Sequence, residues 1–151
     1  MSNHFNPLTV SVLIVTYNRS DHVRTCLEHL ARQTRTPNEV VVVDSSPGSE
    51  TAQVVAGFPG VVYLRNERGR GSTATSRAIG VAATTGEVIA YLDDDAFAEA
   101  DWLERLLMPY VDPRVAAVGG RARNGIAGEE AAGLDEVGLL LPDGRLTGNF
   151  G

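Results

Sequence analysis

The stretch E-V-I-A-Y-L-D-D-D, Glu87 to Asp95, decides the predicted fold. Its first six residues are mostly apolar, which predicts a strand buried in a sheet, and the strand runs directly into three consecutive aspartates. Ligands of open α/β sheets bind beyond the carboxyl ends of the strands. A buried strand that ends in carboxylates therefore indicates a binding edge.

Predicted strands and helices alternate on both sides of this segment. Further strands are expected at Val10 to Thr16, Glu39 to Asp44, Val61 to Leu64 and Val115 to Gly119. Helices are expected from Ser20, over about 49–56, over about 72–85 with Gly86 as a left-handed terminator, and after a capping Asp101. A hairpin is expected at Leu139 to Leu146. The alternation predicts an α/β fold with a mainly parallel sheet flanked by helices.

Composition sets the class of protein. The 151 residues, 43% hydrophobic and 21% charged, predict a single domain over 1–151. A net charge of −6 argues against nucleic acid as a partner. The N-terminus lacks a signal-peptide pattern and no apolar run approaches the roughly 20 residues that span a bilayer, so we expect a cytoplasmic protein whose membrane contact would need sequence outside this chain. The single cysteine, Cys26, fits a small core residue.

The three aspartates predict a metal site. Carboxylates that share a site repel one another, and a hard cation such as Mg²⁺ or Mn²⁺ relieves that repulsion while binding the phosphates of a substrate. Successive side chains point in opposite directions, so Asp93 and Asp95 should share a face while Asp94 turns away. The alternative is a solvated turn in which one acid caps the following helix.

Two other strand ends should meet the aspartates at the same edge. Thr16, Tyr17 and Asn18 close the first strand, where backbone amides and polar side chains suit a ribose or base. Asp44 ends an all-valine strand and can accept hydrogen bonds from a base or ribose. Its alternative is a turn in which Asp44 accepts from the Ser46 amide. Three arginines are candidate partners for a diphosphate or for the acids: Arg68, Arg70 and Arg77.

Four motifs in order resemble the family 2 glycosyltransferases with the GT-A fold. They are V-S-V-L-I-V-T-Y-N-R, L-A-R-Q-T, E-V-V-V-V-D-S-S, and T-T-G-E-V-I-A-Y-L-D-D-D-A followed by D-W-L. The match runs from about Val10 to Leu107. Together the motifs are far more specific than any one alone.

The resemblance implies transfer of a sugar, with inversion, from a nucleotide-diphosphate-sugar donor to a sugar, lipid or small-molecule acceptor. It implies that Thr16 and Tyr17 line the nucleoside pocket and that Asp44 contacts the base. It places Asp93 near the ribose and makes Asp95 the ligand of the metal. The nucleotide-sugar-binding set then comprises Thr16, Tyr17, Asn18, Asp44, Arg77, Asp93 and Asp94, and the metal ligands are Asp95 and Asp93.

The chain departs from the family pattern in two places. Where the family has A-R-N, this sequence has Ser76-Arg77-Ala78, which keeps the arginine and lacks the amide. No general base is evident after Leu134, so we expect an incomplete GT-A domain that stops before the acceptor half. Two further functions are therefore weighed: a non-catalytic nucleotide-binding fragment, and a haloacid dehalogenase-type phosphohydrolase, which also uses D-x-D but normally on its first strand.

Overall fold

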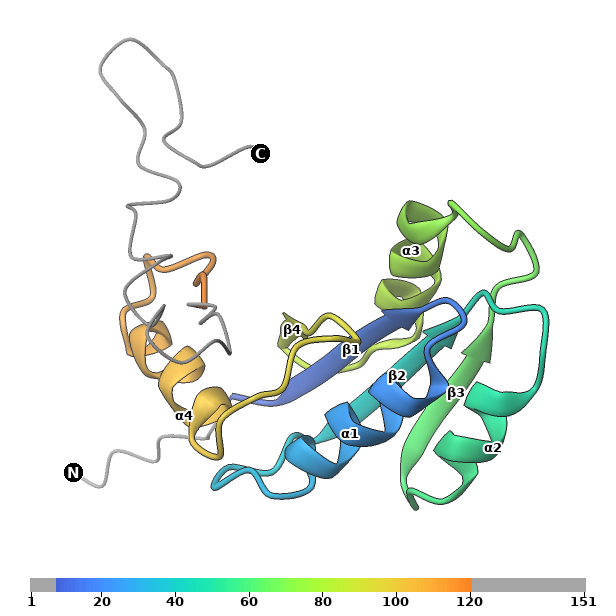
Figure 1. Ribbon diagram of the computed structural model, residues 1–151. Helices are drawn as coiled ribbons and strands as arrows, with labels where there is room; N and C mark the ends of the chain where they lie inside the picture. The colour runs from blue at the N-terminus through green and yellow to red at the C-terminus, as the bar shows by residue number, and fades with distance from the viewer. Residues whose placement is uncertain (1–7, 121–151) are drawn as a thin grey trace, which may run out of the picture. The chain divides into compact units, whose positions relative to one another are not determined.

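Four parallel strands, in the order β3-β2-β1-β4, make the sheet of the computed structural model (Figure 1). The structure describes residues 8–120, nearly all of which belong to the first of two compact units, 1–118 and 119–151. The strands are β1 (Val10–Thr16), β2 (Glu39–Asp44), β3 (Val61–Arg65) and β4 (Val88–Tyr91). The predicted parallel α/β sheet is confirmed, and the bounds of β1 and β2 match the prediction.

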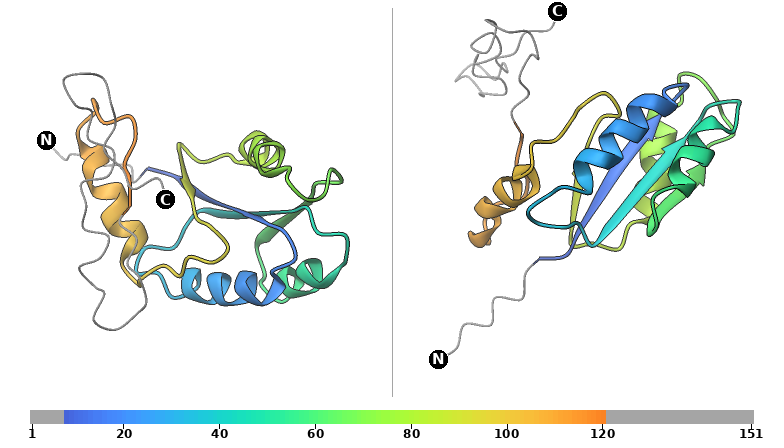
Figure 2. Two further views of the ribbon diagram at one scale, coloured as in Figure 1. Left: turned by 45° about the horizontal axis from the view of Figure 1, so that its top comes forward. Right: turned by 60° about the horizontal axis from the view of Figure 1, so that its bottom comes forward.

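Helices cover both faces of the sheet. The helix α3 (Thr73–Ala83) lies on one face, whereas α1 (Ser20–Leu30) and α2 (Glu50–Ala56) lie on the other, as the edge-on view shows (Figure 2). A short helix α4 (Trp102–Leu107) and a 3₁₀ turn η1 (Met108–Val111) follow β4. None of the helices within residues 8–120 is long and apolar enough to cross a membrane.

The core follows from the alternation of side chains along β1. Val10, Val12 and Ile14 are fully buried and belong to the larger cluster with the apolar residues of α1 and α2. Leu13 points to the opposite face and packs with residues of β2 beneath α3. Because β1 is apolar on both faces, it can only be a central strand.

Two expectations about secondary structure are wrong. Residues 115–119 form no strand, because this short apolar run finds no neighbouring strand within the described part of the chain to share a hydrogen-bonded ladder. Gly86 is not a left-handed terminator, since α3 ends at Ala83 and Thr84 is already extended (φ −77°, ψ 146°). A β-carbon at Gly86 would lie 2.6 Å from the Ser11 nitrogen, so glycine is needed there for close packing. The predicted hairpin over 139–146 lies outside the described residues.

Strand register brings the polar strand ends together. Thr16 pairs with Asp44, and Asp44 pairs with Arg65, across three neighbouring strands. Beyond the end of β4, the Leu92 amide donates to the Leu13 carbonyl, which keeps the chain beside β1 as it enters the aspartates. The carboxyl edge of the sheet is therefore where a site can form.

Candidate functional site

The middle aspartate of the turn is the one that points inward. Asp94 is only 6% exposed, and its Oδ2 accepts a 2.7 Å hydrogen bond from the Thr16 hydroxyl at the end of β1. Its Oδ1 accepts from Arg19 Nη1 at 3.1 Å. Asp94 thus ties the turn to β1 and to the segment that opens α1.

The outer two aspartates are exposed, and each is paired with an arginine from a different element. Asp95 Oδ2 lies 2.8 Å from Arg19 Nη1, and Asp93 Oδ1 lies 3.7 Å from Arg77 Nη2 on α3. Their side chains remain 53% and 69% exposed. Asp94 is the buried member of the three, but the predicted shared face of Asp93 and Asp95 stays a prediction, because Asp95 shares Arg19 Nη1 with Asp94 whereas Asp93 pairs with Arg77 on α3. The two carboxylates raise the pKa of Arg19, Asp94 more strongly than Asp95.

The donor set at this turn is compatible with a hard divalent cation. Residues 8–120 contain no cluster of three or more histidine, cysteine or acidic side chains placed to hold a metal. Mg²⁺ and Mn²⁺, however, are usually held by one or two carboxylates together with substrate phosphates and water. Asp93 and Asp95 supply that number of carboxylates, provided that they exchange their arginine partners for the ion.

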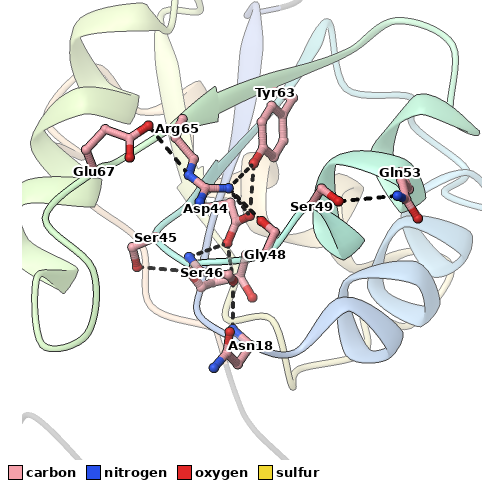
Figure 3. A network of polar contacts seen from close by, with 11 residues as sticks. Asn18, Asp44, Ser45, Ser46, Gly48, Ser49, Gln53, Tyr63, Arg65 and Glu67 are labelled. Carbon is pink, nitrogen blue, oxygen red and sulfur yellow. Dashed lines mark hydrogen bonds and ion pairs between the residues drawn. The ribbon is translucent and has the colours of Figure 1, made fainter.

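Asp44 lies at the centre of a network of polar contacts at the end of β2 (Figure 3). Its side chain is fully buried. Oδ1 accepts from the Ser46 amide at 2.8 Å and from the Ser46 hydroxyl, and Oδ2 accepts from the Tyr63 hydroxyl at 2.9 Å. Arg65 Nη1 lies 3.9 Å from Oδ2. The Asx turn that the sequence offered as the alternative is therefore present, while a contact with a base stays a prediction.

Tyr63 and Arg65 complete this network from β3. They are two residues apart, so their side chains emerge on the same face of the strand. Arg65 Nη1 donates to the Gly48 carbonyl at 2.7 Å and to the Tyr63 hydroxyl at 3.4 Å. Burial raises the pKa of Tyr63, which keeps the hydroxyl protonated and able to donate to Asp44.

Two hollows open beside this network. One, of about 280 Å³, is lined by Tyr17, Ser45, Ser46, Pro47, Arg65, Asn66, Glu67 and Gly69. The other, of about 340 Å³, lies toward α1 and α2 and is lined by Asn18, Ser20, Ser46, Pro47, Gly48, Glu50 and Thr51. Asn18, in the left-handed region at φ 53°, donates its amide to the Ser46 hydroxyl and so links the turns after β1 and β2. The residues predicted at the first two strand ends thus line or support the hollows.

Sequence reasoning missed several residues of this edge. Arg19, Tyr63 and Arg65 were not singled out, although Tyr63 and Arg65 follow from the strand register once β2 and β3 are paired. Asn66 is also buried, and its side chain donates to the hydroxyls of Ser72 and Ser76 at the start of α3. Ser76, which departs from the A-R-N pattern, therefore has a structural role in holding α3 against the loop. Arg68 and Arg70 lie exposed in that loop.

Fold and site together define a class. A parallel sheet with helices on both faces and polar hollows at its carboxyl edge is an open α/β domain, the class in which ligands bind beyond the carboxyl ends of the strands. Residues 11–144 match the sequence profile of Glycosyl transferase family 2. The chain belongs to that family, and its sheet and helices are those of the GT-A fold.

Individual relatives agree with this assignment. The chain is 37% identical over 119 residues to a glucosyl-dolichyl phosphate glucuronosyltransferase of Haloferax volcanii, which covers 75% of this chain and 38% of the relative. It is 36% identical over 105 residues to the putative glycosyltransferase EpsH of Bacillus subtilis, covering 65% of this chain and 29% of EpsH. The chain therefore spans about a third of the length of the curated relatives it matches.

Solved structures show the same fold. A mannosyltransferase, PcManGT from Pyrobaculum calidifontis, determined in complex with GDP-Man and Mn²⁺, superposes with a TM-score of 0.63 at 27% identity, covering 74% of this chain and 34% of that one. S. aureus TarS 1-349 in complex with UDP superposes with a TM-score of 0.62 at 25% identity, covering 70% and 32%.

Proposed function

We propose that this chain is the donor-binding part of a glycosyltransferase that transfers a sugar, with inversion, from a nucleotide-diphosphate sugar. Family membership supports this proposal, as do neighbours determined with UDP, UDP-GlcNAc and GDP-Man. A sugar, lipid or small molecule is the proposed acceptor. The family match favours the transferase over the haloacid dehalogenase-type phosphohydrolase. The single domain over 1–151 and the cytoplasmic location stay predictions.

One observation carries the proposal: the Thr16 hydroxyl holds Asp94 inward at the end of β1, while Asp93 and Asp95 stay exposed on either side of it in the sequence. A diphosphate that leaves the nucleoside hollow would meet these two carboxylates next. We assign the nucleoside to the hollow of about 280 Å³ that Tyr17 lines. Thr16, Asn18 and Asp44 position its walls through the contacts described above.

The residues at the aspartate turn have separate roles in this proposal. Asp93 and Asp95 would hold the Mg²⁺ or Mn²⁺ ion, which when bound supplies Lewis-acid stabilisation of the charge on the departing nucleotide diphosphate. Arg77, half exposed on α3, donates to the diphosphate once Asp93 releases it. Asp94 stays buried and fixes the backbone of the turn, so only the arginine partners of the two outer carboxylates change when the donor binds.

Calorimetric titration with UDP-glucose, UDP-GlcNAc and GDP-mannose, each with and without Mn²⁺, tests the proposal. At least one donor should bind the chain more tightly with Mn²⁺, and Asp95→Asn should lower that affinity about tenfold, equivalent to about 1.4 kcal/mol. Asp112→Asn is the matched control, because Asp112 also pairs with an arginine but lies in the segment after η1. Equal donor affinity in Asp95→Asn and the unmodified chain would contradict the proposed metal role.

Product analysis separates the remaining functions. Binding of a donor with neither transfer nor hydrolysis would indicate the non-catalytic nucleotide-binding fragment. Release of phosphate from a simple phosphomonoester with Mg²⁺ would indicate the phosphohydrolase and would count against the transferase.

A further inference from the structure

The hollow of about 340 Å³ toward α1 and α2 holds no part of the donor in the proposed function. Its lining comes from the turns after β1 and β2 and from the first residues of α1 and α2. It shares only Ser46 and Pro47 with the nucleoside hollow. The Ser46 hydroxyl donates to Asp44 and accepts from the Asn18 amide, so this wall is held in place (Figure 3). A ligand in the larger hollow would therefore be separated from the nucleoside.

The larger hollow is lined by polar side chains that have no hydrogen-bond partner among residues 8–120: Asn18, Ser20, Glu50 and Thr51. The clearest case is Thr51, which is only 2% exposed. Every fully buried side-chain nitrogen and oxygen of the described residues has a partner, so the small surface that Thr51 keeps includes its hydroxyl. A hydroxyl withdrawn from water costs free energy unless another partner replaces the water. These side chains therefore offer donors and acceptors to a ligand.

Glu50 lies folded back against the turn after β2. A β-carbon on Gly48 would overlap the Glu50 carboxylate, so the glycine leaves room for this side-chain position. The Gly48 carbonyl accepts a 2.7 Å hydrogen bond from Arg65 Nη1, which fixes the turn against β3. The carboxylate is thus an acceptor at the edge of the hollow.

The charge of the lining favours a neutral ligand. A helix N-terminus attracts negative charge, and both α1 and α2 begin at this hollow. Asp21 and Glu50 already supply that charge in the first turns of the two helices. The described residues that line the hollow include no lysine, arginine or histidine, and the adjoining Arg19 is paired with the aspartate turn. A phosphate here would meet a carboxylate without a compensating cation.

We propose that this hollow binds a neutral sugar unit through its hydroxyl groups. A sugar hydroxyl both donates and accepts, so it can pair with groups of either kind. The Glu50 carboxylate accepts from one hydroxyl, the Asn18 carboxamide pairs with two neighbouring hydroxyls, and the Thr51 hydroxyl pairs with another. A volume of about 340 Å³ lies at the lower end for small-ligand pockets, which suits a single sugar unit. This site lies outside the proposed donor site and does not depend on it.

NMR titration of the chain with neutral sugars tests the site. The probes are glucose, galactose, mannose and N-acetylglucosamine, together with the trisaccharides maltotriose and chitotriose. At least one should shift the amide resonances of Ser20, Glu50 and Thr51 with a dissociation constant on the order of 1 mM, as expected of so small a ligand. Tighter binding of a trisaccharide would identify a glycan chain as the source of the sugar unit, and equal binding would identify a free sugar.

Thr51→Val removes the hydroxyl and keeps the shape of the side chain. Sugar binding should weaken about three- to tenfold, the contribution of one hydrogen bond, while the free energy of unfolding stays unchanged or rises because an unpaired hydroxyl is lost. Thr25→Val is the matched control, since Thr25 lies on α1 outside the lining. Glu50→Gln, at an exposed position, should also weaken sugar binding at least threefold, whereas Glu28→Gln, exposed on α1, should not.

Several outcomes would overturn the inference and leave the donor site standing. One is that no neutral sugar shifts these resonances, or that Thr51→Val lowers stability while sugar binding stays the same in it and in Glu50→Gln. Another is that UDP with Mn²⁺ competes with the sugar, which would place the sugar in the donor site. A third is that glucosamine, which carries an ammonium group, binds while glucose does not, because the hollow would then select a cation.

Discussion

Replacing Thr16 by valine should destabilise the domain and loosen the aspartate turn. The hydroxyl donates a 2.7 Å hydrogen bond to a carboxylate that is only 6% exposed, and valine keeps the shape while removing the donor. Every fully buried side-chain nitrogen and oxygen within the described residues has a hydrogen-bond partner. The substitution therefore creates an unsatisfied buried acceptor in a network that was complete.

The size of the effect follows from the charge of Asp94. A hydrogen bond to a charged group contributes about 1.5–3 kcal/mol, and Arg19 still holds the other oxygen, so we expect a loss of about 2 kcal/mol. For a chain of this length that loss corresponds to a decrease in Tm of roughly 4–8 °C. Mn²⁺-dependent donor binding should weaken as well, because Asp93 and Asp95 depend on Asp94 for their position.

Urea unfolding followed by circular dichroism measures the change, with Thr25→Val as the control. The Thr25 hydroxyl donates only to the Asp21 carbonyl one turn earlier on α1, in an exposed position, so its loss should change the free energy of unfolding by less than about 0.5 kcal/mol. A difference of less than about 0.5 kcal/mol between the free energies of unfolding of the two variants would mean that the bond between Thr16 and Asp94 does not hold the turn. The proposed positioning of Asp93 and Asp95 by Asp94 would then be wrong.

Two further predictions concern the sheet and the thiol. The Ser11 hydroxyl, followed by the Thr85 amide and hydroxyl, lowers the pKa of Glu39 at the other end of the sheet. Because the folded pKa is depressed, this stabilisation is present above the ordinary glutamate pKa and is lost as pH falls through the folded value. Ser11→Ala should therefore raise the Glu39 pKa in an NMR titration. It should also make the free energy of unfolding fall less steeply as the pH is lowered. An unchanged Glu39 titration midpoint in the variant would contradict this. Burial raises the pKa of Cys26 to about 12, so iodoacetamide at pH 8 should modify it only in the unfolded chain, as mass spectrometry of the native protein can check.

The elements that could be predicted from sequence are those whose pattern is local. β1 and β2 are apolar runs that end abruptly in polar residues, and their observed bounds match the prediction. The run over 115–119 has similar residues but forms no strand, since a strand depends on a neighbour that a local pattern does not contain. Gly86 was predicted to end α3 because it follows a helical pattern in the sequence. In the structure, glycine is needed at this position because Ser11, which is distant in the sequence, leaves no room for a β-carbon.

The site was predictable as a convergence of strand ends but not as a set of contacts. The rule for parallel sheets brings Thr16, Asp44 and the aspartates to one edge, and they do lie there. The partners of those residues depend on register across long sequence separations, as with Arg19, which contacts Asp94 and Asp95 from β1's end. No spacing in the sequence marks that pairing in advance.

The arginines also change the argument for a metal. Repulsion among three adjacent carboxylates suggests a cation, but Arg19 and Arg77 already supply positive charge to Asp95 and Asp93. Repulsion among the three carboxylates is therefore already compensated by arginine and does not by itself indicate a bound ion. Exposed ion pairs such as these contribute only about 0–1 kcal/mol, so a divalent cation that arrives with a diphosphate can displace them at little cost. Arg77 would then be free to pair with the diphosphate, while Arg19 would stay with Asp94, so the ion pairs are compatible with the proposed donor site.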